Sequence, residues 1–324
     1  MLDAFQSLKP KPLHTVTPAE ARKGPTFADG VKKVLAAQGK PAQPDATVMT
    51  EDRAMQLAGR SLPIRVYTPQ GTSPRPLIVY FHGGGFVVAD KTVYDAGARA
   101  LAKDAGAVVV SVDYRLAPEH PYPASLEDAV ASFRYVVEHA AEFHGNPAQI
   151  AVAGESAGAN LATAVALRQK QDSQRLPGFQ LLVYPFLSTD VSTPSHVKNG
   201  QGNYVIGNQD IAWFWKHELG SGWKTVKDPL ALPILATQDQ LTGLPPALII
   251  TGALDPLKDD GSTYAAHLKA AGVKTELKNY DAVTHEFYGM GAVVDTARQA
   301  EKDAATALQR AFASDRGVGG SSGQ

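Results

Sequence analysis

The pentapeptide Gly154-Glu155-Ser156-Ala157-Gly158 is the strongest signal in this sequence, because it places a serine in the pattern G-x-S-x-G. An apolar segment, residues 150–153, precedes it, and residues 160–167, which have the composition of a buried helix, follow it. A sharp turn from a strand into a helix holds such a serine in strained backbone geometry, with its hydroxyl pointing out of the sheet. The start of the helix also favours negative charge beside that hydroxyl. The context therefore favours a nucleophilic serine over an ordinary glycine-rich turn.

Short apolar segments rich in Val and Ile alternate with helical patterns on both sides of this turn. These segments are residues 62–68, 77–82, 107–113, 149–154, 180–186, 246–251 and 273–280. The most apolar of them show no alternation of apolar and polar residues, which is typical of parallel strands covered on both faces. Longer stripes with helical spacing separate them, for example over residues 126–141. The sequence therefore predicts an α/β fold with a mostly parallel sheet.

Composition and charge exclude several classes of function. The chain has 324 residues, with 31 Lys and Arg against 32 Asp and Glu, which gives a net charge of −1. This balance excludes a strongly basic nucleic-acid-binding protein and a polybasic membrane-surface protein. The absence of cysteine excludes disulfides, thiolate metal sites and a cysteine nucleophile. No apolar run approaches a membrane span, and the first twenty residues lack the apolar core of a signal peptide, so we expect a cytoplasmic protein.

A second motif, His82-Gly83-Gly84-Gly85-Phe86, follows the expected strand at residues 77–82. Three glycines let backbone amides approach a substrate oxygen without a Cβ in the way, and acyl transfer needs such donors around the oxyanion. Alone, the triplet would indicate a loop or, weakly, a phosphate site. It lacks the spacing of a dinucleotide-binding loop and the Lys-Ser/Thr of a P-loop. Together with the serine turn, it predicts an oxyanion loop.

These two motifs and a third, residues 113–119 (Asp-Tyr-Arg-Leu-Ala-Pro-Glu), resemble the hormone-sensitive-lipase family (bacterial family IV) of α/β-hydrolase carboxylesterases. The resemblance spans roughly residues 60–313 and implies an eight-stranded, mostly parallel sheet flanked by helices, with a helical cap. The expected organisation is an N-terminal part of the cap (1–50), the core in two parts (51–186 and 226–313), a cap insertion between them (187–225) and a flexible tail (314–324).

The histidine of the catalytic triad is expected after the serine and the acid, because this fold has the chain order serine, acid, histidine. Among the nine histidines, His285 lies in a loop after the expected strand at residues 273–280. Catalytic side chains of such folds stand at the carboxyl ends of strands. His285 is therefore the expected base, and it matches the position of the family's histidine. The family often has glycine after this histidine, where this chain has Glu286.

The acid is expected after the strand at residues 246–251, where three carboxylates are candidates: Asp255, Asp259 and Asp260. Asp255, followed by Pro256, matches the acid motif of the family. Asp259 and Asp260 stand at what looks like a helix start, where carboxylates interact favourably with the helix dipole. The resemblance therefore assigns the acid to Asp255.

These residues imply an acyl-enzyme mechanism. Ser156 would attack an ester carbonyl while His285 takes its proton, and Asp255 would orient the imidazole. The expected oxyanion donors are the backbone amides of Ala157 and of two glycines, Gly84 with either Gly83 or Gly85. No metal or organic cofactor is needed. The expected function is hydrolysis of short- to medium-chain carboxylic esters, and the chain length rests on the resemblance.

Substrate binding and assembly are less constrained by the sequence. The candidate pocket residues are Phe86, Trp213 and Phe214, although the tryptophans of this region could equally join the cap to the core. The expected partner is a small ester, with no nucleic acid or membrane, and the protein is expected to be a monomer or a homodimer. Two other functions stay open: a serine peptidase or amidase on the same fold, and a non-catalytic ligand-binding relative.

Overall fold

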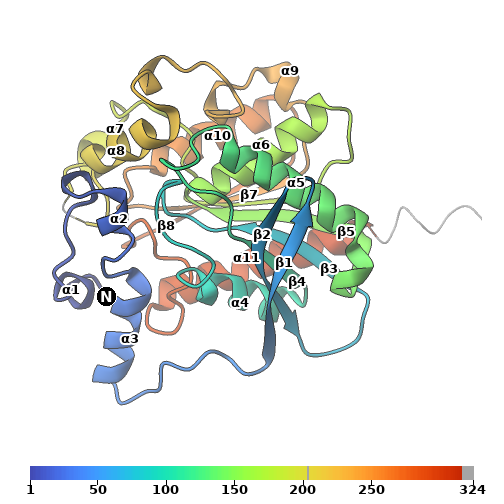
Figure 1. Cartoon of the computed structure of the whole chain (residues 1–324), viewed down its shortest axis with the longest axis horizontal. Helices are drawn as coiled ribbons and strands as arrows, with labels where there is room; N and C mark the ends of the chain where they lie inside the picture. Colours follow the sequence, from blue (N-terminus) through green and yellow to red (C-terminus); the bar gives the residue numbers. More distant parts are fainter. Residues whose placement is uncertain (203, 316–324) are drawn as a thin grey trace, which may run out of the picture.

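A computed structural model describes residues 1–202 and 204–315 of the chain (Figure 1). Its centre is one eight-stranded sheet with the order β1-β2-β4-β3-β5-β6-β7-β8. The strands are β1 (Val48–Leu57), β2 (Arg60–Pro69), β3 (Arg75–Phe81), β4 (Val108–Val112), β5 (Gly145–Glu155), β6 (Gln180–Val183), β7 (Ala247–Gly252) and β8 (Thr275–Tyr280). Strand β2 pairs antiparallel with β1 and with β4, and all other neighbours are parallel. The predicted sheet is therefore confirmed.

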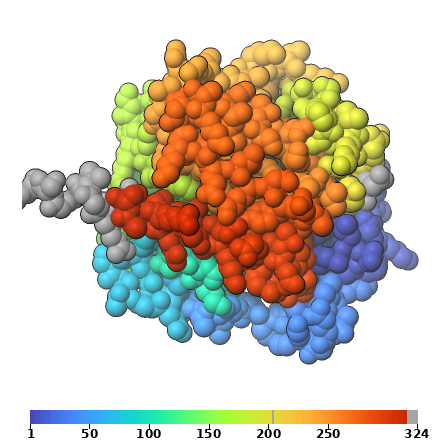
Figure 2. All heavy atoms as spheres, turned by 180° about the vertical axis from the view of Figure 1, so that it is seen from behind, coloured from blue at the N-terminus to red at the C-terminus, as the bar shows by residue number. Residues whose placement is uncertain are grey.

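Helices cover both faces of the sheet (Figure 1). They are α1 (Leu2–Gln6), α2 (Pro18–Ala21), α3 (Phe27–Ala37), α4 (Asp95–Ala105), α5 (Ala124–Glu138), α6 (Ala157–Gln171), α7 (Pro194–Asn199), α8 (Asn208–Leu219), α9 (Gln238–Leu241), α10 (Lys258–Ala270) and α11 (Asp295–Asp315). Helices α5, α6 and α10 contribute to the core on one face, and α4 and α11 to the core on the other. Figure 2 shows α11, in red, on the surface of the molecule. Its residues Ala297, Ala300, Ala304 and Leu308 are fully buried.

Two boundaries differ from the expected ones. Strand β1 begins at Val48, before the predicted end of the N-terminal cap segment at residue 50. Helix α11 runs to Asp315, two residues into the segment predicted to be a flexible tail, and residues 316–324 of that segment lie outside the described residues. In the described part of the chain, no helix is both long enough and apolar enough to cross a membrane.

The N-terminal helices and the α7–α8 region lie side by side at one end of the molecule, in blue and yellow in Figure 1. The imidazole Nδ1 of His14 lies 2.7 Å from a carboxylate oxygen of Asp210 in α8. The guanidinium of Arg22 forms two hydrogen bonds with Glu119, at 2.8 and 2.7 Å, and one with the carbonyl oxygen of Val87, at 2.8 Å. These contacts fix the N-terminal segment to α8 and to the loops that follow β3 and β4.

Candidate active site

Ser156 stands at the turn between β5 and α6, where its backbone adopts φ +56° and ψ −116°. This conformation is rare for residues with a side chain and marks a strained turn. The flanking glycines make the turn possible, because a Cβ on Gly154 would lie 2.2 Å from the carbonyl oxygen of Gly158. A Cβ on Gly158 would lie 1.9 Å from the carbonyl oxygen of Phe81 at the end of β3. The G-x-S-x-G spacing therefore reflects how tightly β3, β5 and α6 meet.

Three side chains from separate strand ends meet at this turn. The Oγ of Ser156 lies 2.9 Å from Nε2 of His285, in the loop after β8. The Nδ1 of His285 lies 2.8 Å from Oδ2 of Asp255, in the loop after β7. The other oxygen of Asp255 accepts the backbone amide of Leu257 at 2.8 Å, which fixes the carboxylate. All three side chains are at least 96 % buried, Ser156 being 4 % exposed. The structure thus brings the three predicted residues into one hydrogen-bonded chain.

The electrostatics of His285 favour its protonated form. Burial lowers the pKa of the imidazole, but the charge and hydrogen bond of Asp255, with a contribution from Glu286, outweigh that effect and raise the pKa above its ordinary value. The ring of Tyr184 packs against the imidazole, with ring centroids 4.6 Å apart. The site can therefore accept a proton at Nε2 while holding the ring in place.

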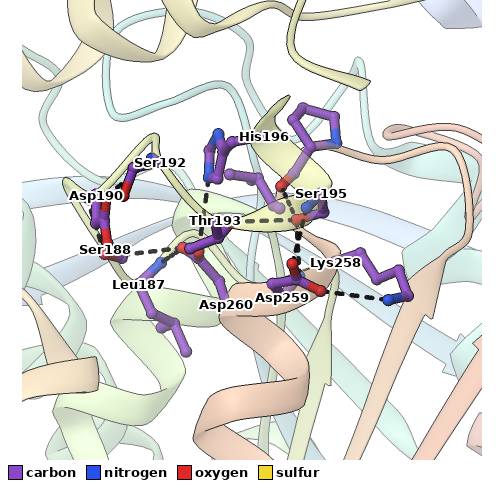
Figure 3. A network of polar contacts seen from close by, with 12 residues as sticks. Leu187, Ser188, Asp190, Ser192, Thr193, Ser195, His196, Lys258, Asp259 and Asp260 are labelled. Atoms are coloured by element: carbon purple, nitrogen blue, oxygen red, sulfur yellow. Dashed lines mark hydrogen bonds and ion pairs between the residues drawn. The ribbon is translucent and has the colours of Figure 1, made fainter. Parts of the chain in front are cut away.

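The other two candidate carboxylates bind the α7 region instead of His285 (Figure 3). Asp260 accepts the backbone amides of Leu187 and Ser188, at 3.1 and 3.0 Å, and faces the buried imidazole of His196 at 3.7 Å. Asp259 accepts the backbone amide of Ser195 at 2.8 Å. Both carboxylates therefore join α10 to the chain that follows β6.

Helix α7 also holds the loop that carries Asp255. The Oγ of Ser195 donates a hydrogen bond to the carbonyl oxygen of Pro256 at 2.6 Å (Figure 3). The side-chain amide of Asn199 donates to the carbonyl oxygens of Ala253 and Asp255, each at 3.2 Å. The backbone on both sides of the acid is thus bonded to this helix, which the sequence did not reveal.

The glycine loop after β3 borders the same site. Gly84 and Gly85 have φ values of +96° and +58°, a region that glycine adopts without strain. Within the described residues, the backbone amides of Gly83, Gly84, Gly85 and Ala157 have no acceptor. The glycines are also required by close packing, because a Cβ on Gly83 would lie 2.3 Å from the hydroxyl of Tyr94, and one on Gly85 would lie 2.1 Å from the ring of Phe214.

The histidine of the HGGG motif supports this loop. His82 is 1 % exposed, and its Nδ1 lies 2.8 Å from the carbonyl oxygen of Gly83. Burial lowers the pKa of His82, although the charge of Asp113 opposes this. Tyr114, from the third sequence motif, stacks on the imidazole at a centroid distance of 4.4 Å and donates to the carbonyl oxygen of His82 at 2.8 Å. The third motif therefore stabilises the loop that the second one forms.

Glu155, beside the serine, has a buried carboxyl group. Its carboxyl group accepts hydrogen bonds from the hydroxyls of Tyr80 and Tyr184, and its side chain is 1 % exposed. Burial raises the pKa of Glu155 to about 8, which the two tyrosine hydrogen bonds only partly offset. A protonated carboxyl therefore supports the turn at neutral pH.

A cavity of about 1500 Å³ leads from Ser156 between the N-terminal segment and α8. Its lining includes apolar side chains: Phe186, Ile206, Ile211, Phe214 and Leu257. Phe214 was a predicted pocket residue.

Phe86 and Trp213 were also predicted to line the pocket, and these predictions are corrected because neither residue lines this cavity. Phe86 packs against Phe186 and Trp215. Trp213 packs edge-on against Phe214 and His217. Phe86 thus joins the glycine loop to α8, whereas these contacts of Trp213 lie within α8.

Two polar residues of the cavity were not predicted to matter. Tyr94, at the start of α4, and Glu286, after His285, line the cavity beside Ser156. The hydroxyl of Tyr94 donates to Oε1 of Glu286 at 2.6 Å, and this oxygen lies 3.8 Å from Nε2 of His285. The two residues are 192 positions apart in the chain, so no local pattern could have linked them.

Comparison with known proteins identifies relatives of this chain. A family profile described as "alpha/beta hydrolase fold" matches residues 78–289. The carboxylesterase NlhH of Mycobacterium tuberculosis is 38 % identical over 297 residues, which cover 89 % of this chain and 91 % of the relative. The ethyl acetate hydrolase of Pseudomonas putida is 32 % identical over 311 residues, with 92 % of each chain covered.

Solved structures show the same likeness. A thermostable esterase from Pseudomonas putida superposes with a TM-score of 0.87 at 31 % identity, covering 96 % of this chain and 95 % of the other. An esterase from Pyrobaculum calidifontis superposes with a TM-score of 0.84 at 33 % identity, covering 96 % and 98 %. The fold and the site define an α/β-hydrolase. The chain belongs to this family, within the hormone-sensitive-lipase-like group (family IV) of carboxylesterases.

Proposed function

We propose that this carboxylesterase hydrolyses short- to medium-chain acyl esters through an acyl-enzyme on Ser156. The observation that carries the proposal is the continuous hydrogen-bonded chain from Ser156 through His285 to Asp255, open to a cavity at the serine. Serine hydrolases use this arrangement for nucleophilic catalysis, because the imidazole accepts the serine proton as the hydroxyl attacks.

In the acylation step, Oγ of Ser156 forms a bond to the carbonyl carbon and its proton moves to Nε2 of His285. The negative charge goes to the carbonyl oxygen, where the unpaired amides of Gly84, Gly85 and Ala157 act as donors. Collapse of this intermediate breaks the bond to the alcohol oxygen, which leaves with the proton from Nε2. Water then attacks the acyl-enzyme with His285 as base, and the acid product leaves.

The substrate class is supported by the lining of the cavity. Part of its wall is apolar, which suits an acyl chain, and this part includes the bulky Phe186 and Phe214. The relative from Pseudomonas putida is named for the hydrolysis of ethyl acetate, an ester of a short acid. Both observations favour short acyl groups over long chains.

We further propose that the N-terminal segment and the insertion at residues 187–225 act together as a cap. Residues of both segments line the cavity, for example Leu13 and Phe214. The contact between His14 and Asp210 joins them directly. A cap of this kind would exclude water from the acyl-enzyme and limit the size of the substrate.

Hydrolysis of p-nitrophenyl esters from acetate to dodecanoate tests the proposed function. We expect kcat/KM to be highest for a short or medium acyl chain. S156A should lower kcat by at least about a thousandfold, whereas S61A, which removes an exposed hydroxyl on β2, should retain activity. A maximum at dodecanoate would contradict the substrate class. Faster cleavage of a matched p-nitroanilide would indicate an amidase, and an inactive wild type would indicate a non-catalytic relative.

A further inference from the structure

Glu286 places a second carboxylate next to the catalytic imidazole. Its side chain is 19 % exposed and lines the cavity with Ser156 and His285. Its Oε1 lies 3.8 Å from Nε2 of His285, whereas Asp255 binds Nδ1 on the other side of the ring. The hydroxyl of Tyr94 holds that oxygen at 2.6 Å. The imidazole therefore stands between two carboxylates.

The carboxylate of Glu286 has no cationic partner of its own. Among the described residues, no lysine or arginine forms an ion pair with it, and its Oε2 accepts no hydrogen bond. Burial raises the pKa of Glu286, and the charge of Asp255 adds to this, while His285 and Tyr94 oppose it. A carboxylate held in a cavity without a cation is a group that a cationic ligand can stabilise.

The position of Glu286 relates it to the leaving alcohol of an ester. Nε2 of His285 gives its proton to the alcohol oxygen, so that oxygen must come within about 3 Å of Nε2. A carboxylate oxygen 3.8 Å from the same nitrogen is then within reach of a substituent two or three bonds beyond the alcohol oxygen. The acyl chain, in contrast, is attached to the carbonyl carbon and not to that oxygen.

We propose that Glu286 is a specificity-determining residue that favours esters whose leaving alcohol carries a protonated amine, such as the esters of amino alcohols. The ammonium group would bond to the free oxygen of the carboxylate, while Tyr94 keeps the other oxygen in place. The inference rests on the proposed function, because it assumes that His285 protonates the alcohol.

A different role would act on all esters alike. If Glu286 served only to stabilise the imidazolium of His285, its loss would change the rates of neutral and cationic esters by the same factor. Two esters of the same shape separate these roles: 2-(dimethylamino)ethyl butyrate and 3-methylbutyl butyrate, in which a carbon replaces the nitrogen. The test quantity is the ratio of their kcat/KM values at pH 7, where the amine is protonated.

We expect the ratio of cationic to neutral ester to fall about tenfold in E286Q, the size of one charge-assisted hydrogen bond in free energy. D281N removes an exposed charge from the same loop that does not line the cavity, so it should leave the ratio unchanged. An unchanged ratio in E286Q, or an equal fall in D281N, would overturn the proposal. If the wild type cleaved neither ester, the proposed function would fail instead.

A measurement on the wild type covers the case in which E286Q does not fold. Inhibition of p-nitrophenyl butyrate hydrolysis by 2-(dimethylamino)ethanol is compared with inhibition by 3-methylbutan-1-ol. We expect the amino alcohol to inhibit several times more strongly at pH 7. Equal inhibition by the two alcohols would contradict a cation-binding role for Glu286.

Discussion

The buried Glu155 should make the stability of this protein fall as the pH rises, and one substitution should reduce that dependence. Its pKa is about 8 in the folded protein, against an ordinary value of 4.5, because burial disfavours the charged form. A carboxyl with a raised folded pKa contributes stability that is fully present below pH 4.5 and is lost as the pH rises toward 8. The difference of 8 − 4.5 units corresponds to about 5 kcal/mol at most.

Glu155→Gln isolates this contribution, because the amide has nearly the same shape and stays neutral in both states. Its oxygen can accept from one of Tyr80 and Tyr184, and its NH₂ group can donate to the other. Most of the loss falls between pH 5 and 8, so the wild type should lose about 3 kcal/mol more of its free energy of unfolding over this range than E155Q does.

Urea unfolding of the wild type and of E155Q at pH 5, 6.5 and 8 measures this difference. Two other buried carboxyls, Glu218 and Glu301, also have a pKa raised by burial, to about 8 and about 7, but they are present in both proteins and cancel. E218Q provides a matched control, since it should flatten the dependence without touching the serine turn. Parallel pH dependences for the wild type and E155Q would refute the reasoning, because they would show equal pKa values of Glu155 in the folded and unfolded chains.

Three further substitutions test the glycine loop, a buried ion-pair cluster and the support of Asp255. Gly85→Ala should lower kcat for p-nitrophenyl butyrate at least about tenfold, because a Cβ at this position would lie 2.1 Å from Phe214 and would shift the loop. A kcat equal to that of the wild type would contradict this. Asp128→Ala should lower the free energy of unfolding in urea by about 2–4 kcal/mol, since this fully buried carboxylate pairs with two arginines. Asn199→Ala should lower kcat more than it changes KM, because the side-chain amide of Asn199 donates a hydrogen bond to the backbone of Asp255. An unchanged kcat would show that the loop of Asp255 does not need this hydrogen bond.

Burial explains which strands stand out most clearly in the sequence. The central strands β3 to β7 are covered on both faces, so their apolar runs stand out; β4, for example, is buried at every position. Strand β1 was not predicted, because it is an edge strand whose residues between Val48 and Met55 are mostly exposed and polar. Its pairing with β2 fixes it as a strand, and such pairing leaves no local hydrophobic pattern.

The residues of the proposed reaction could be predicted more easily than those of the proposed selectivity, because only the reaction's residues have a local sequence pattern. Ser156 was identified from its sequence neighbours, since the strained turn needs small residues at fixed offsets. The sequence marked Glu286 only as a departure from the glycine that the family often has there, and its proposed role depends on Tyr94, 192 residues earlier. The packing of α4 against the loop after β8 brings them together, and a sequence without coordinates does not specify that geometry.

We therefore expect a substitution at Tyr94 to change the substrate preference of this chain more than its type of reaction. A substitution at Tyr94 leaves the hydrogen bonds among Ser156, His285 and Asp255 intact, since the hydroxyl of Tyr94 touches none of them. It does release the carboxylate of Glu286, which then can turn away from Nε2. If the proposed role of Glu286 holds, relatives that share Ser156, His285 and Asp255 are expected to differ in the alcohols that they accept, with the differences located where α4 meets the loop after β8.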